Sequence, residues 1–547
     1  MLKLIKFLEI FAFKKILIVL SFLSDFNLTS NSSNLFNQLN LNQIPFISSY
    51  HHHHHQNSSS KPLRIAIIGG GPAGTSAAFF LSRLSNQSRN HADIHLFESS
   101  NRIGGRVLSI KPFDSDQFQS IEAGASIFVG ANKHLNHAAK IFNLSLQDYN
   151  QDKSENGPIA IWDGTEFVFE ETGSEWWDTL KLVWRYGRAP FQLSSINKQT
   201  INQFEQIYKE SFISIGPFDS FHEWLSHSGL LNFLPITGSD YLINQKSINL
   251  QAVNELAAIF TRTNYGQDIS NIHALATLVS LAGKSGRSVI GGNHQIFQHF
   301  LNQSQSKLHL NHQIHTISQS NPNKTYSNPQ YLLSYHQNSK NLTATTDPFD
   351  IVIIAAPFHQ SGLTLQNIQQ SIQLPSIQPY VRLHVTFIIT NSTSPSGELF
   401  GKSKDQTVSR MIYSTMMRNV LGKGKRPVFN TVNYLKNLGQ KDGVIGDMHI
   451  VKIFSEAPVT TGTLQKLFKH EQNLLWVKRL EWDAYPFLNP IQSDFPPIQL
   501  TQGIYYVNGF ESFMSTMETQ TLMSFNIASL ITKNYWNFNP KRNWIDE

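Results

Sequence analysis

Three glycines in a short stretch form the clearest chemical pattern in this sequence. The segment Gly69-Gly-Gly71-Pro-Ala-Gly74 follows an apolar run at residues 64–68 and precedes a stretch with helical spacing. In a strand–turn–helix unit the first glycine permits the tight turn, the second lets the backbone approach a pyrophosphate, and the third lets helix and strand pack closely. The N–H groups at the helix N-terminus then bind the diphosphate. The predicted contacts are Gly69, Gly71, Pro72, Ala73 and Gly74.

An acidic residue ends the next strand-like run. Residues 93–98 alternate in polarity and close on Glu98, which is followed by Ser99. In dinucleotide-binding domains an acid at this position accepts hydrogen bonds from the adenosine ribose hydroxyls. We therefore predict that Glu98 and Ser99 contact the cofactor. The alternative is a solvated acid at the end of a strand.

A second glycine pair follows directly in Arg102-Ile-Gly104-Gly105-Arg106. This pair brings another backbone segment to the dinucleotide, and Arg106 adds positive charge against the phosphates. The second segment favours FAD over NAD as the cofactor. Further along lie Gly124 and Ala125, where glycine permits a close approach of the backbone; the family resemblance described below implies that this segment passes under the flavin.

The elements that must position these residues are spread over the whole chain. Strand-like runs at 64–69 and 93–98 flank a helical stretch at 72–85, which gives a βαβ unit. A buried strand is predicted at 349–356, and a closing strand and helix at 503–508 and 517–533. Between them lie helices at 175–186, 199–212, 250–260 and 294–302, and strands at 313–318, 330–335, 381–390 and 447–454. The order predicts an α/β protein with a discontinuous GR2-type Rossmann FAD-binding domain and an inserted mixed α+β substrate domain.

The predicted division of the chain follows from this order. The FAD-binding domain takes three parts and the substrate domain two, and the N-terminal region lies outside both. The expected segments are 1–25 (signal peptide), 26–60 (disordered linker rich in Ser, Asn and His), 61–150, 286–360 and 496–536 (FAD-binding domain), 151–285 (helical insert of the substrate domain) and 361–495 (its sheet).

The first residues resemble a targeting segment. Four lysines between residues 3 and 15 precede an apolar run at 16–23, which is too short to span a bilayer but suits a signal-peptide core. Glu9 and the lack of a small-x-small cleavage site leave two alternatives open, a misplaced start codon and a simple apolar leader. The histidine run at 51–55 is interpreted as low-complexity sequence or a tag.

Composition excludes several classes of chemistry. The 547 residues include no cysteine, so a disulfide, a catalytic thiol, a redox dithiol and a cysteinyl-flavin bond are all impossible. No metal centre is predicted. The formal net charge of +6 is small for this length and no Lys/Arg-rich block is present, so we expect no nucleic-acid partner.

Several segments point to a known family. The R-x-G-G-R run at 102–106 resembles that of the amine oxidases, protoporphyrinogen oxidases and phytoene desaturases. Other segments resemble prenylcysteine oxidases, also called prenylcysteine lyases, in the same order from about residue 61 to residue 536. These segments are 181–187, 263–267, 289–293, 482–486, 505–511 and 515–518.

This resemblance implies an FAD-dependent thioether oxidase of the lysosome or vacuole, reached through the secretory pathway, with secretion as the alternative. Its substrates would be farnesyl- and geranylgeranyl-cysteine, and dioxygen and water would be consumed. A hydride would leave the carbon beside sulfur for FAD, and water would then release cysteine and a prenyl aldehyde, with hydrogen peroxide as the other product. No transmembrane span is expected, and a peripheral contact with a membrane is left open.

The resemblance also implies roles for individual residues. Trp184, Arg185 and Tyr186 lie on the helical insert expected to form the substrate cleft, where Arg185 would meet a carboxylate. The returning C-terminal strand and helix would bring Gly509, Glu511 and Met517 to the flavin. Glu518 is a candidate base or water-positioning group; the alternative is a helix-terminal charge. FAD is expected to be bound non-covalently.

Two other functions are compatible with this fold. One is an amine-oxidase-like FAD enzyme acting on an apolar substrate. The other is a non-catalytic prenyl-binding carrier, because GDP-dissociation inhibitors and Rab escort proteins resemble the fold without flavin chemistry. The middle segments argue against the first, and the intact glycine motifs and Glu98 argue against the second.

Overall fold

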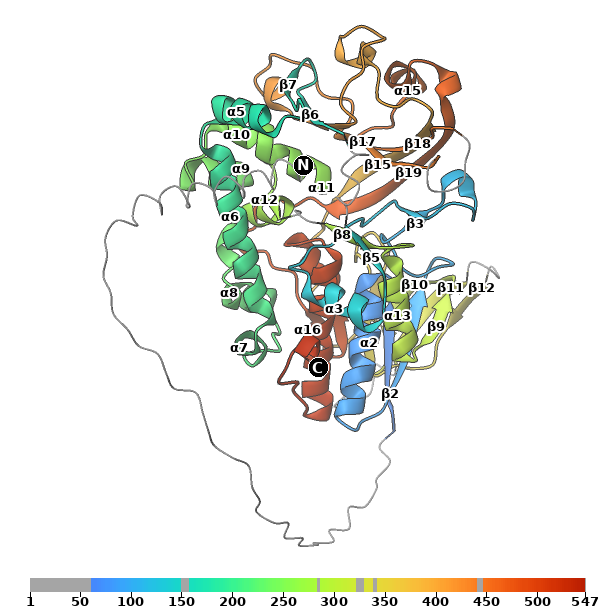
Figure 1. The fold of residues 1–547 in the computed structure, drawn as a ribbon. Helices are drawn as coiled ribbons and strands as arrows, with labels where there is room; N and C mark the ends of the chain where they lie inside the picture. Colours follow the sequence, from blue (N-terminus) through green and yellow to red (C-terminus); the bar gives the residue numbers. More distant parts are fainter. Residues whose placement is uncertain are drawn as a thin grey trace, which may run out of the picture.

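The computed structural model describes residues 61–148, 157–282, 286–320, 329–337, 342–439 and 446–546 (Figure 1). The predicted signal peptide and linker, residues 1–25 and 26–60, lie outside the described residues.

A six-stranded sheet carries the glycine-rich turn. Its order is β20-β21-β13-β1-β2-β9, and five of its strands run parallel while β20 pairs antiparallel with β21. The strands are β1 (Leu63–Ile68), β2 (Ala92–Glu98), β9 (Lys307–Leu310), β13 (Ile351–Ile354), β20 (Gln499–Thr501) and β21 (Ile504–Tyr506). Segments separated by several hundred residues are therefore direct neighbours, as a discontinuous dinucleotide-binding fold requires.

Both faces of this sheet are covered, which explains the unbroken apolar run in β1. Ile65 and Ile67 pack against three helices, whereas Ala66 and Ile68 pack against a second sheet of four strands in the order β12-β11-β10-β14. The helices are α2 (Pro72–Gln87), α13 (His294–Ser304) and α16 (Met517–Trp536). The four strands are β10 (His312–Gln319), β11 (Tyr331–Gln337), β12 (Leu342–Thr345) and β14 (Thr364–Gln366).

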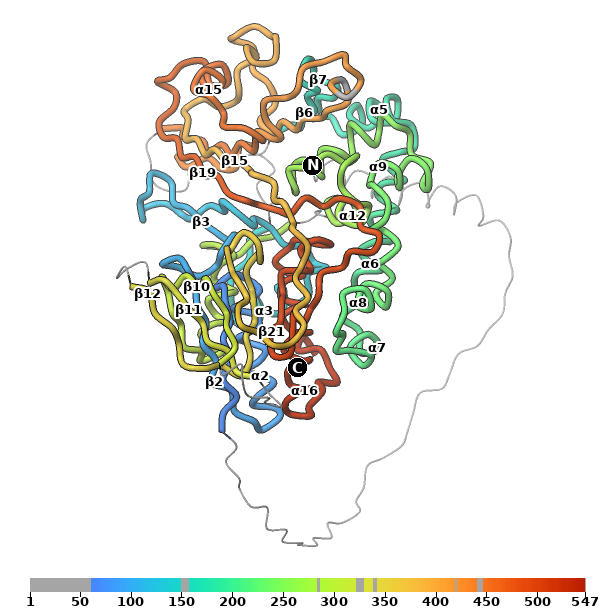
Figure 2. The backbone as a smooth tube through the Cα atoms, turned by 180° about the vertical axis from the view of Figure 1, so that it is seen from behind, coloured from blue at the N-terminus to red at the C-terminus, as the bar shows by residue number. Residues whose placement is uncertain are grey.

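A seven-stranded sheet forms the second half of the molecule, seen above the first in Figures 1 and 2. Its order is β19-β15-β18-β17-β16-β6-β7, antiparallel except between β16 and β6. The strands are β6 (Ile159–Trp162), β7 (Phe167–Glu170), β15 (Tyr380–Thr390), β16 (Met411–Ser414), β17 (Thr431–Asn437), β18 (His449–Ser455) and β19 (Leu474–Pro486). The sheet thus combines strands from both predicted segments of the substrate domain.

Helices border this sheet and reach toward the six-stranded sheet. They are α5 (Glu175–Tyr186), α6 (Ala189–Phe204), α7 (Glu210–Ile213), α8 (Phe221–His227), α9 (Gly238–Asp240), α10 (Leu250–Ala252), α11 (Ala258–Asn264), α12 (Ala274–Leu281), α14 (Met417–Val420) and α15 (Thr461–Phe468). Short elements at the junction of the two halves are β3 (Ser109–Ile110), β4 (Ile121–Glu122), α3 (Lys133–Ile141), β5 (Leu146–Asp148) and β8 (Arg287–Val289). Among the described helices, none is long and apolar enough to cross a membrane.

Most predicted elements are present, with informative differences. The helix predicted at 199–212 is divided, because α6 ends at Phe204 and a 3₁₀ turn at Glu205–Tyr208 precedes α7. The helix predicted at 250–260 contains a π-helical stretch at Val253–Ala257. The four-stranded sheet takes in β14, which lies beyond the predicted boundary at residue 360. Hydrophobic spacing alone reports neither the helix type nor the pairing partner. The domain boundaries remain a prediction.

Candidate active site

The glycine-rich turn joins β1 to α2. Gly69 has φ +110°, and a side chain there would place a Cβ 2.5 Å from the carbonyl oxygen of Ala355 on the neighbouring strand. A Cβ at Gly74 would lie 1.8 Å from the carbonyl oxygen of Gly69. These two glycines therefore make the turn and the helix–strand packing possible, as predicted from their spacing.

Gly71 stands in a different environment. The nearest described atom to a Cβ built there is the Cα of Gly105, at 3.9 Å. The first turn of α2 begins at Pro72 and is uncharged, and the N-cap Gly71 offers no side chain to its N–H groups. The positive end of the helix is thus open toward the space in front of Gly71. This arrangement fits the diphosphate of a dinucleotide.

Glu98 connects the two glycine segments. Its carboxylate accepts hydrogen bonds from the backbone N–H of Gly70 at 2.7 Å and of Ser100 at 2.9 Å, and Ser99 Oγ lies 3.4 Å away. The half-buried carboxylate thus holds the loop in place by hydrogen bonds, a role that sequence reasoning did not assign to it. Contact with a ribose remains a prediction for Glu98 and Ser99.

The second glycine pair lies against the first. Gly104 donates its N–H to the carbonyl oxygen of Gly70 at 2.8 Å, and Gly105 faces Gly71. Arg102 donates to the carbonyl oxygen of Gly105 at 2.8 Å and so shapes the turn rather than extending from it. The structure therefore brings together the two backbone segments that the sequence predicted to meet at the dinucleotide.

Arg106 has a carboxylate partner within the chain. Its guanidinium forms an ion pair with the buried Glu511 and donates to the carbonyl oxygen of Ala484 at 2.9 Å. Tyr380 also donates to Glu511, at 3.1 Å. Glu511 therefore ties Arg106 to β15, a contact that the sequence did not reveal. Gly509 packs against the ring of Phe221, where a Cβ would come within 2.7 Å.

A largely apolar cavity of about 330 Å³ lies between the seven-stranded sheet and the N-terminus of α16. Four predicted site residues line one end: Gly124, Ala125, Met517 and Glu518. Its walls include Ile159, Phe204, Leu275, Met411 and Phe454. A Cβ at Gly124 would lie 1.8 Å from the carbonyl oxygen of Arg106, so this glycine is required by the chain's own packing. The same cavity is thus lined by residues predicted to contact the cofactor and by apolar side chains.

Glu518 is fully engaged at this end. Its carboxylate accepts hydrogen bonds from the N–H groups of His134 at 2.9 Å and Leu135 at 3.0 Å, and from the Tyr208 hydroxyl at 2.5 Å. Burial raises the pKa of Glu518 to about 7, although these donors oppose the rise. Glu518 lies in the first turn of α16, as the helix-terminal alternative predicted, and its carboxylate also accepts from the N-terminal N–H groups of α3.

The three predicted substrate residues lie outside the cavity. Arg185 forms a two-point ion pair with Glu255, at 2.7 and 2.9 Å, and Tyr186 donates to the same carboxylate at 2.9 Å. Trp184 is 89% exposed. The spacing of α5 turns Leu182 and Tyr186 inward, and Trp184 therefore points to the opposite side of the helix.

Sequence reasoning missed a buried lysine in the cavity wall. Lys452 is 5% exposed, and its Nζ donates to the carbonyl oxygen of Glu122 at 2.8 Å and to Ser126 Oγ at 3.1 Å. Burial lowers the pKa of Lys452 to about 8. The available signal was a single cation in the apolar strand β18, at a position where the alternation predicts an inward side chain.

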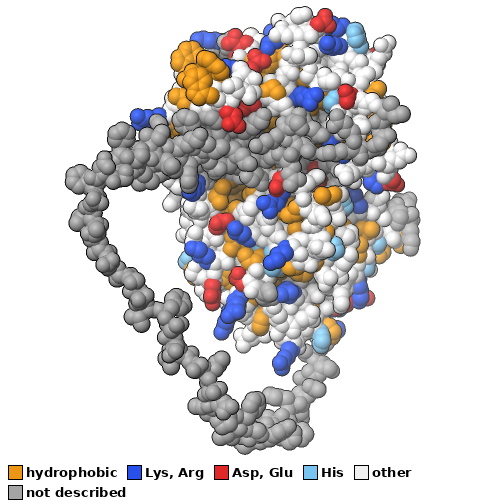
Figure 3. Space-filling view, in the orientation of Figure 1, with side chains coloured by type: hydrophobic (Ala, Val, Ile, Leu, Met, Phe, Trp, Pro, Cys, Tyr) orange, Lys and Arg blue, Asp and Glu red, His pale blue; other side chains and the backbone are white. Residues whose placement is uncertain are grey.

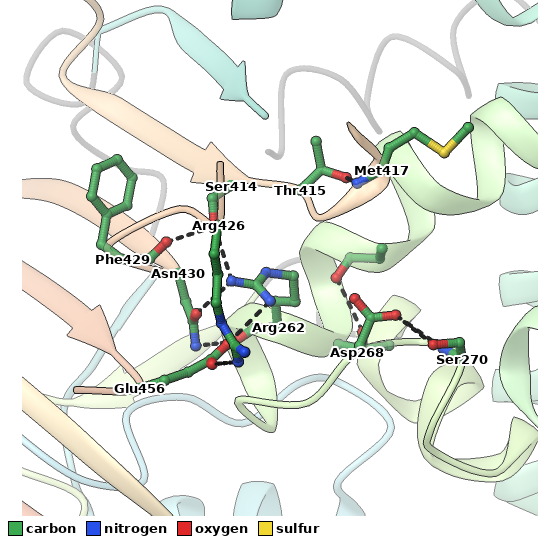
Figure 4. Close-up of polar contacts among 12 residues, drawn as sticks. Arg262, Asp268, Ser270, Ser414, Thr415, Met417, Arg426, Phe429, Asn430 and Glu456 are labelled. Atoms are coloured by element: carbon green, nitrogen blue, oxygen red, sulfur yellow. Dashed lines mark hydrogen bonds and ion pairs between the residues drawn. The ribbon is translucent and has the colours of Figure 1, made fainter. Parts of the chain in front are cut away.

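A second buried cation supports the other wall. Arg262 of α11 donates to Asn430 at 2.8 Å, to Ser414 at 3.3 Å and to Glu456 at 3.2 Å. Figure 4 draws these contacts together with the ion pair between Arg426 and the same Glu456. The network fixes α11 to the last residue of β16 and to the residues that directly precede β17 and follow β18. It thereby holds the cavity residues that follow Arg262 on the chain, Thr263, Asn264 and Tyr265.

The fold and site define a dinucleotide-binding protein of the Rossmann class with an apolar chamber at its cofactor end. Residues 67–142 match the NAD(P)-binding Rossmann-like domain. Two solved oxidases share the fold: cyclohexylamine oxidase from Brevibacterium oxydans (TM-score 0.54, 14% identity, 87% of this chain and 99% of that chain) and putrescine oxidase with bound putrescine (TM-score 0.54, 12% identity, 86% and 99%).

Residues 169–547 match the family described as prenylcysteine lyase. Farnesylcysteine lyase of Arabidopsis thaliana is 30% identical over 87% of this chain and 89% of its own length. Prenylcysteine oxidase 1 is 29% identical in Mus musculus and 28% in Homo sapiens, each over 87% of this chain and 90% of the relative. The chain belongs to the prenylcysteine lyase family.

Proposed function

We propose that this protein is an FAD-dependent oxidase that cleaves the thioether of farnesyl- or geranylgeranyl-cysteine to cysteine, a prenyl aldehyde and hydrogen peroxide. The observation that carries the proposal is the apolar cavity lined at one end by Gly124, Ala125 and Met517. A prenyl chain requires such a chamber, and oxidation of the carbon beside sulfur requires that the chamber meet the cofactor. The substrates named for the family's relatives fit this geometry.

FAD suits the residues that are present. The open cradle at Gly71, the uncharged first turn of α2 and the second segment at Gly105 accommodate a diphosphate between two backbones. Glu98 stands beside them at the end of β2. Bound there, FAD would supply the hydride acceptor, with dioxygen as the final oxidant.

The residues of the chain bind the substrate, orient it and shield it from bulk water. The apolar walls exclude bulk water from the reacting carbon, and the packed sheet and helices limit the orientations that a bound substrate can adopt. The full sequence holds no thiol that could form an adduct with the substrate. Cleavage therefore depends on the cofactor for electron transfer and on the chamber for position.

Incubation with farnesylcysteine under air tests the proposal. Equal amounts of released cysteine and hydrogen peroxide are expected, with the aldehyde oxygen coming from labelled water. Farnesylamine, which offers an amine in place of the thioether, is the matched control for amine-oxidase activity. Peroxide from farnesylamine alone would replace the proposal with that alternative, and prenylcysteine binding without any peroxide would favour a carrier.

We further propose that the protein enters the secretory pathway and acts in the lysosome or vacuole. The lysines and apolar run of residues 3–23 support this location. N-terminal sequencing of the mature protein and fractionation of cells test it. Recovery in the cytosol with Met1 intact would contradict the proposal.

One surface of the molecule supports a peripheral membrane contact. Five large apolar side chains of α5 are exposed on one side of the helix: Trp176, Trp177, Leu180, Val183 and Trp184. Figure 3 shows an apolar group over the position of α5. Tryptophan-rich amphipathic helices lie in the membrane interface. We propose that this α5 surface meets the bilayer from which a prenylated substrate arrives.

A further inference from the structure

Two polar side chains stand side by side in the wall of the apolar cavity. Asn433 of β17 and Lys452 of β18 are register partners across the antiparallel pair, so their side chains leave the same face of the sheet. Both line the cavity, and they are 7% and 5% exposed. Their neighbours on this wall, Met411 and Phe454, are apolar. A polar pair in such surroundings requires an explanation.

Lys452 is a buried cation without a carboxylate in direct contact among the described residues: the Glu122 carboxylate acts on it only electrostatically, and the rings of Phe454 and Phe387 lie 4.7 and 5.5 Å from its Nζ. Within the part that the structure describes, its hydrogen bonds go to the neutral oxygens of Glu122 and Ser126, and it forms no ion pair. The Glu122 carboxylate accepts instead from the N–H of Asn293 at 2.5 Å and from Ser109 Oγ at 3.2 Å. An ammonium has three donors, and two are used here. Lys452 can therefore still donate to an anion in the cavity.

Asn433 contributes the complementary atom. Its Oδ1 is buried and has no hydrogen-bond partner among the described residues. A buried acceptor without a donor destabilises the folded state, and such groups persist where a ligand completes them. The wall thus presents one cation and one free acceptor on adjacent strands.

We propose that Lys452 and Asn433 bind the amino-acid head of prenylcysteine: Lys452 takes the α-carboxylate and Asn433 Oδ1 takes the α-ammonium. This inference rests on the proposed function. A zwitterion carries its two charges on groups bonded to the same carbon, which matches a donor and an acceptor on paired strands. Lys452 also contacts the segment that contains Gly124 and Ala125, so the head group and the adjacent sulfur lie at the cofactor end. The prenyl tail then occupies the apolar remainder.

The assignment makes the pair a determinant of specificity. A peptide bond on either side of the cysteine removes one charge, and so does a methyl ester. The enzyme therefore selects the free amino acid, and hydrolytic reactions that cleave peptide and ester bonds must supply its substrate.

Head-group analogues test the assignment with three variants. The substrates are S-farnesylcysteine, S-farnesylcysteamine without the carboxylate, and S-farnesyl mercaptopropionate without the ammonium. Wild type should prefer farnesylcysteine over each analogue by at least about tenfold in kcat/KM, the loss expected for one charge-assisted hydrogen bond. Lys452→Met should lose only the preference over the cysteamine analogue and keep the preference over the mercaptopropionate analogue. Asn433→Leu should show the opposite result: it should lose only the preference over the mercaptopropionate analogue. Lys436→Met, on the same strand as Asn433 but outside the cavity lining, should keep both preferences.

Stability and binding separate this role from a structural one. Asn433→Leu should unfold at urea concentrations no lower than wild type, because it removes a buried acceptor without a partner. Lys452→Met loses two hydrogen bonds, to Glu122 and Ser126, and should unfold at a somewhat lower urea concentration. FAD content, read from absorbance, should be unchanged. S-decylcysteine, a saturated thioether, should bind Lys452→Met less tightly by calorimetry, whereas S-decylcysteamine should bind both proteins equally. Lower stability of Asn433→Leu, loss of FAD from either variant, or an equal decline with all substrates would overturn the assignment.

Failure of the proposed function would give a different result. Wild-type protein would then oxidise none of the three farnesyl compounds, yet the S-decyl ligands would still report on the head-group site. Equal binding of S-decylcysteine to wild type and Lys452→Met would refute the site itself.

Discussion

At the residue scale, the glycines of the turn between β1 and α2 have different roles. Gly69 and Gly74 are required by the chain itself, because a Cβ at either would come within 2.5 Å of a backbone oxygen. Gly71 faces open space, because a Cβ added there would lie 3.9 Å from its nearest described neighbour. Only Gly71 is therefore free of a packing role, and its lack of a side chain serves the ligand.

Gly71→Val should yield a folded protein that has lost most of its FAD. The Cβ of the new side chain meets no described atom closer than 3.9 Å, whereas its methyl groups occupy the approach of the diphosphate. Flavin absorbance of the purified protein and its urea unfolding curve measure the two properties. Stoichiometric FAD in this variant would show that the dinucleotide lies elsewhere.

Gly74→Val provides the matched control. Its Cβ would overlap the carbonyl oxygen of Gly69 at 1.8 Å, so the helix must move away from the strand. This variant should lose stability as well as cofactor. Equal stability of the two variants would contradict the division of roles between the glycines.

Glu518→Gln should flatten the dependence of stability on pH. Burial raises the pKa of Glu518 from 4.5 to about 7, so its stabilising contribution is complete below pH 4.5 and is lost as the pH rises through about 7. The loss is on the order of 3 kcal/mol at full ionisation. Urea unfolding at about pH 5 and about pH 8 should show a smaller decline in the variant than in wild type. Glu398→Gln, at an exposed residue far from Glu518 in the sequence, should leave the decline unchanged.

At the scale of elements, α5 shows what periodicity can and cannot reveal. The spacing predicted its bounds at 175–186, which the structure confirms. It could not reveal which face is buried, because tryptophans at 176, 177 and 184 form a stripe of the kind that usually packs inward. The inward face instead consists of Asp178, Thr179, Leu182 and Tyr186.

Trp184→Glu should weaken binding to vesicles of a zwitterionic lipid by about tenfold or more, because it removes an apolar anchor and adds a charge. The fold should be unaffected, since this side chain is 89% exposed. Co-sedimentation with vesicles measures the effect. Ile377→Glu, at a residue 80% exposed and far from α5 in sequence, is the control. Equal sedimentation of both variants would remove α5 from the membrane contact.

The same scale explains which site residues could be predicted. The FAD segments are short and contiguous, so Gly69–Gly74 and Arg102–Arg106 could be interpreted from spacing and then found in contact. Lys452 and Asn433 come from separate strands, and their pairing depends on sheet register. The partners of Glu518, in α3 and at Tyr208, lie more than 300 residues away in sequence. Contacts of this kind follow from tertiary packing and leave no local pattern.

At the scale of the whole molecule, a buried histidine, His273, joins α12 to the distant turn at residues 508–512. His273 is fully buried: it accepts from the N–H of Ala276 at 3.1 Å as the N-cap of α12, and its Nε2 lies 3.1 Å from the carbonyl oxygen of Ser512. Because Nδ1 is the acceptor, Nε2 carries the proton and donates to Ser512. The imidazole must therefore be neutral for both contacts to form.

His273→Asn should make the protein more resistant to acid. Burial lowers the pKa of His273 from 6.5 to about 4, so its stabilising contribution is present above pH 6.5 and is lost as the pH falls toward 4. At about pH 5 the loss is on the order of 2 kcal/mol. Asparagine can still cap α12 but does not titrate. Urea unfolding at about pH 7.5 and about pH 5 should show a smaller acid-induced loss of unfolding free energy in the variant than in wild type. The control is His336→Asn, at a residue whose imidazole lies beside Thr343 of the neighbouring strand, and it should match wild type. Equal losses in all three proteins would mean that His273 is already protonated in the fold at pH 5, and the neutral bridge between α12 and the 508–512 turn would be wrong.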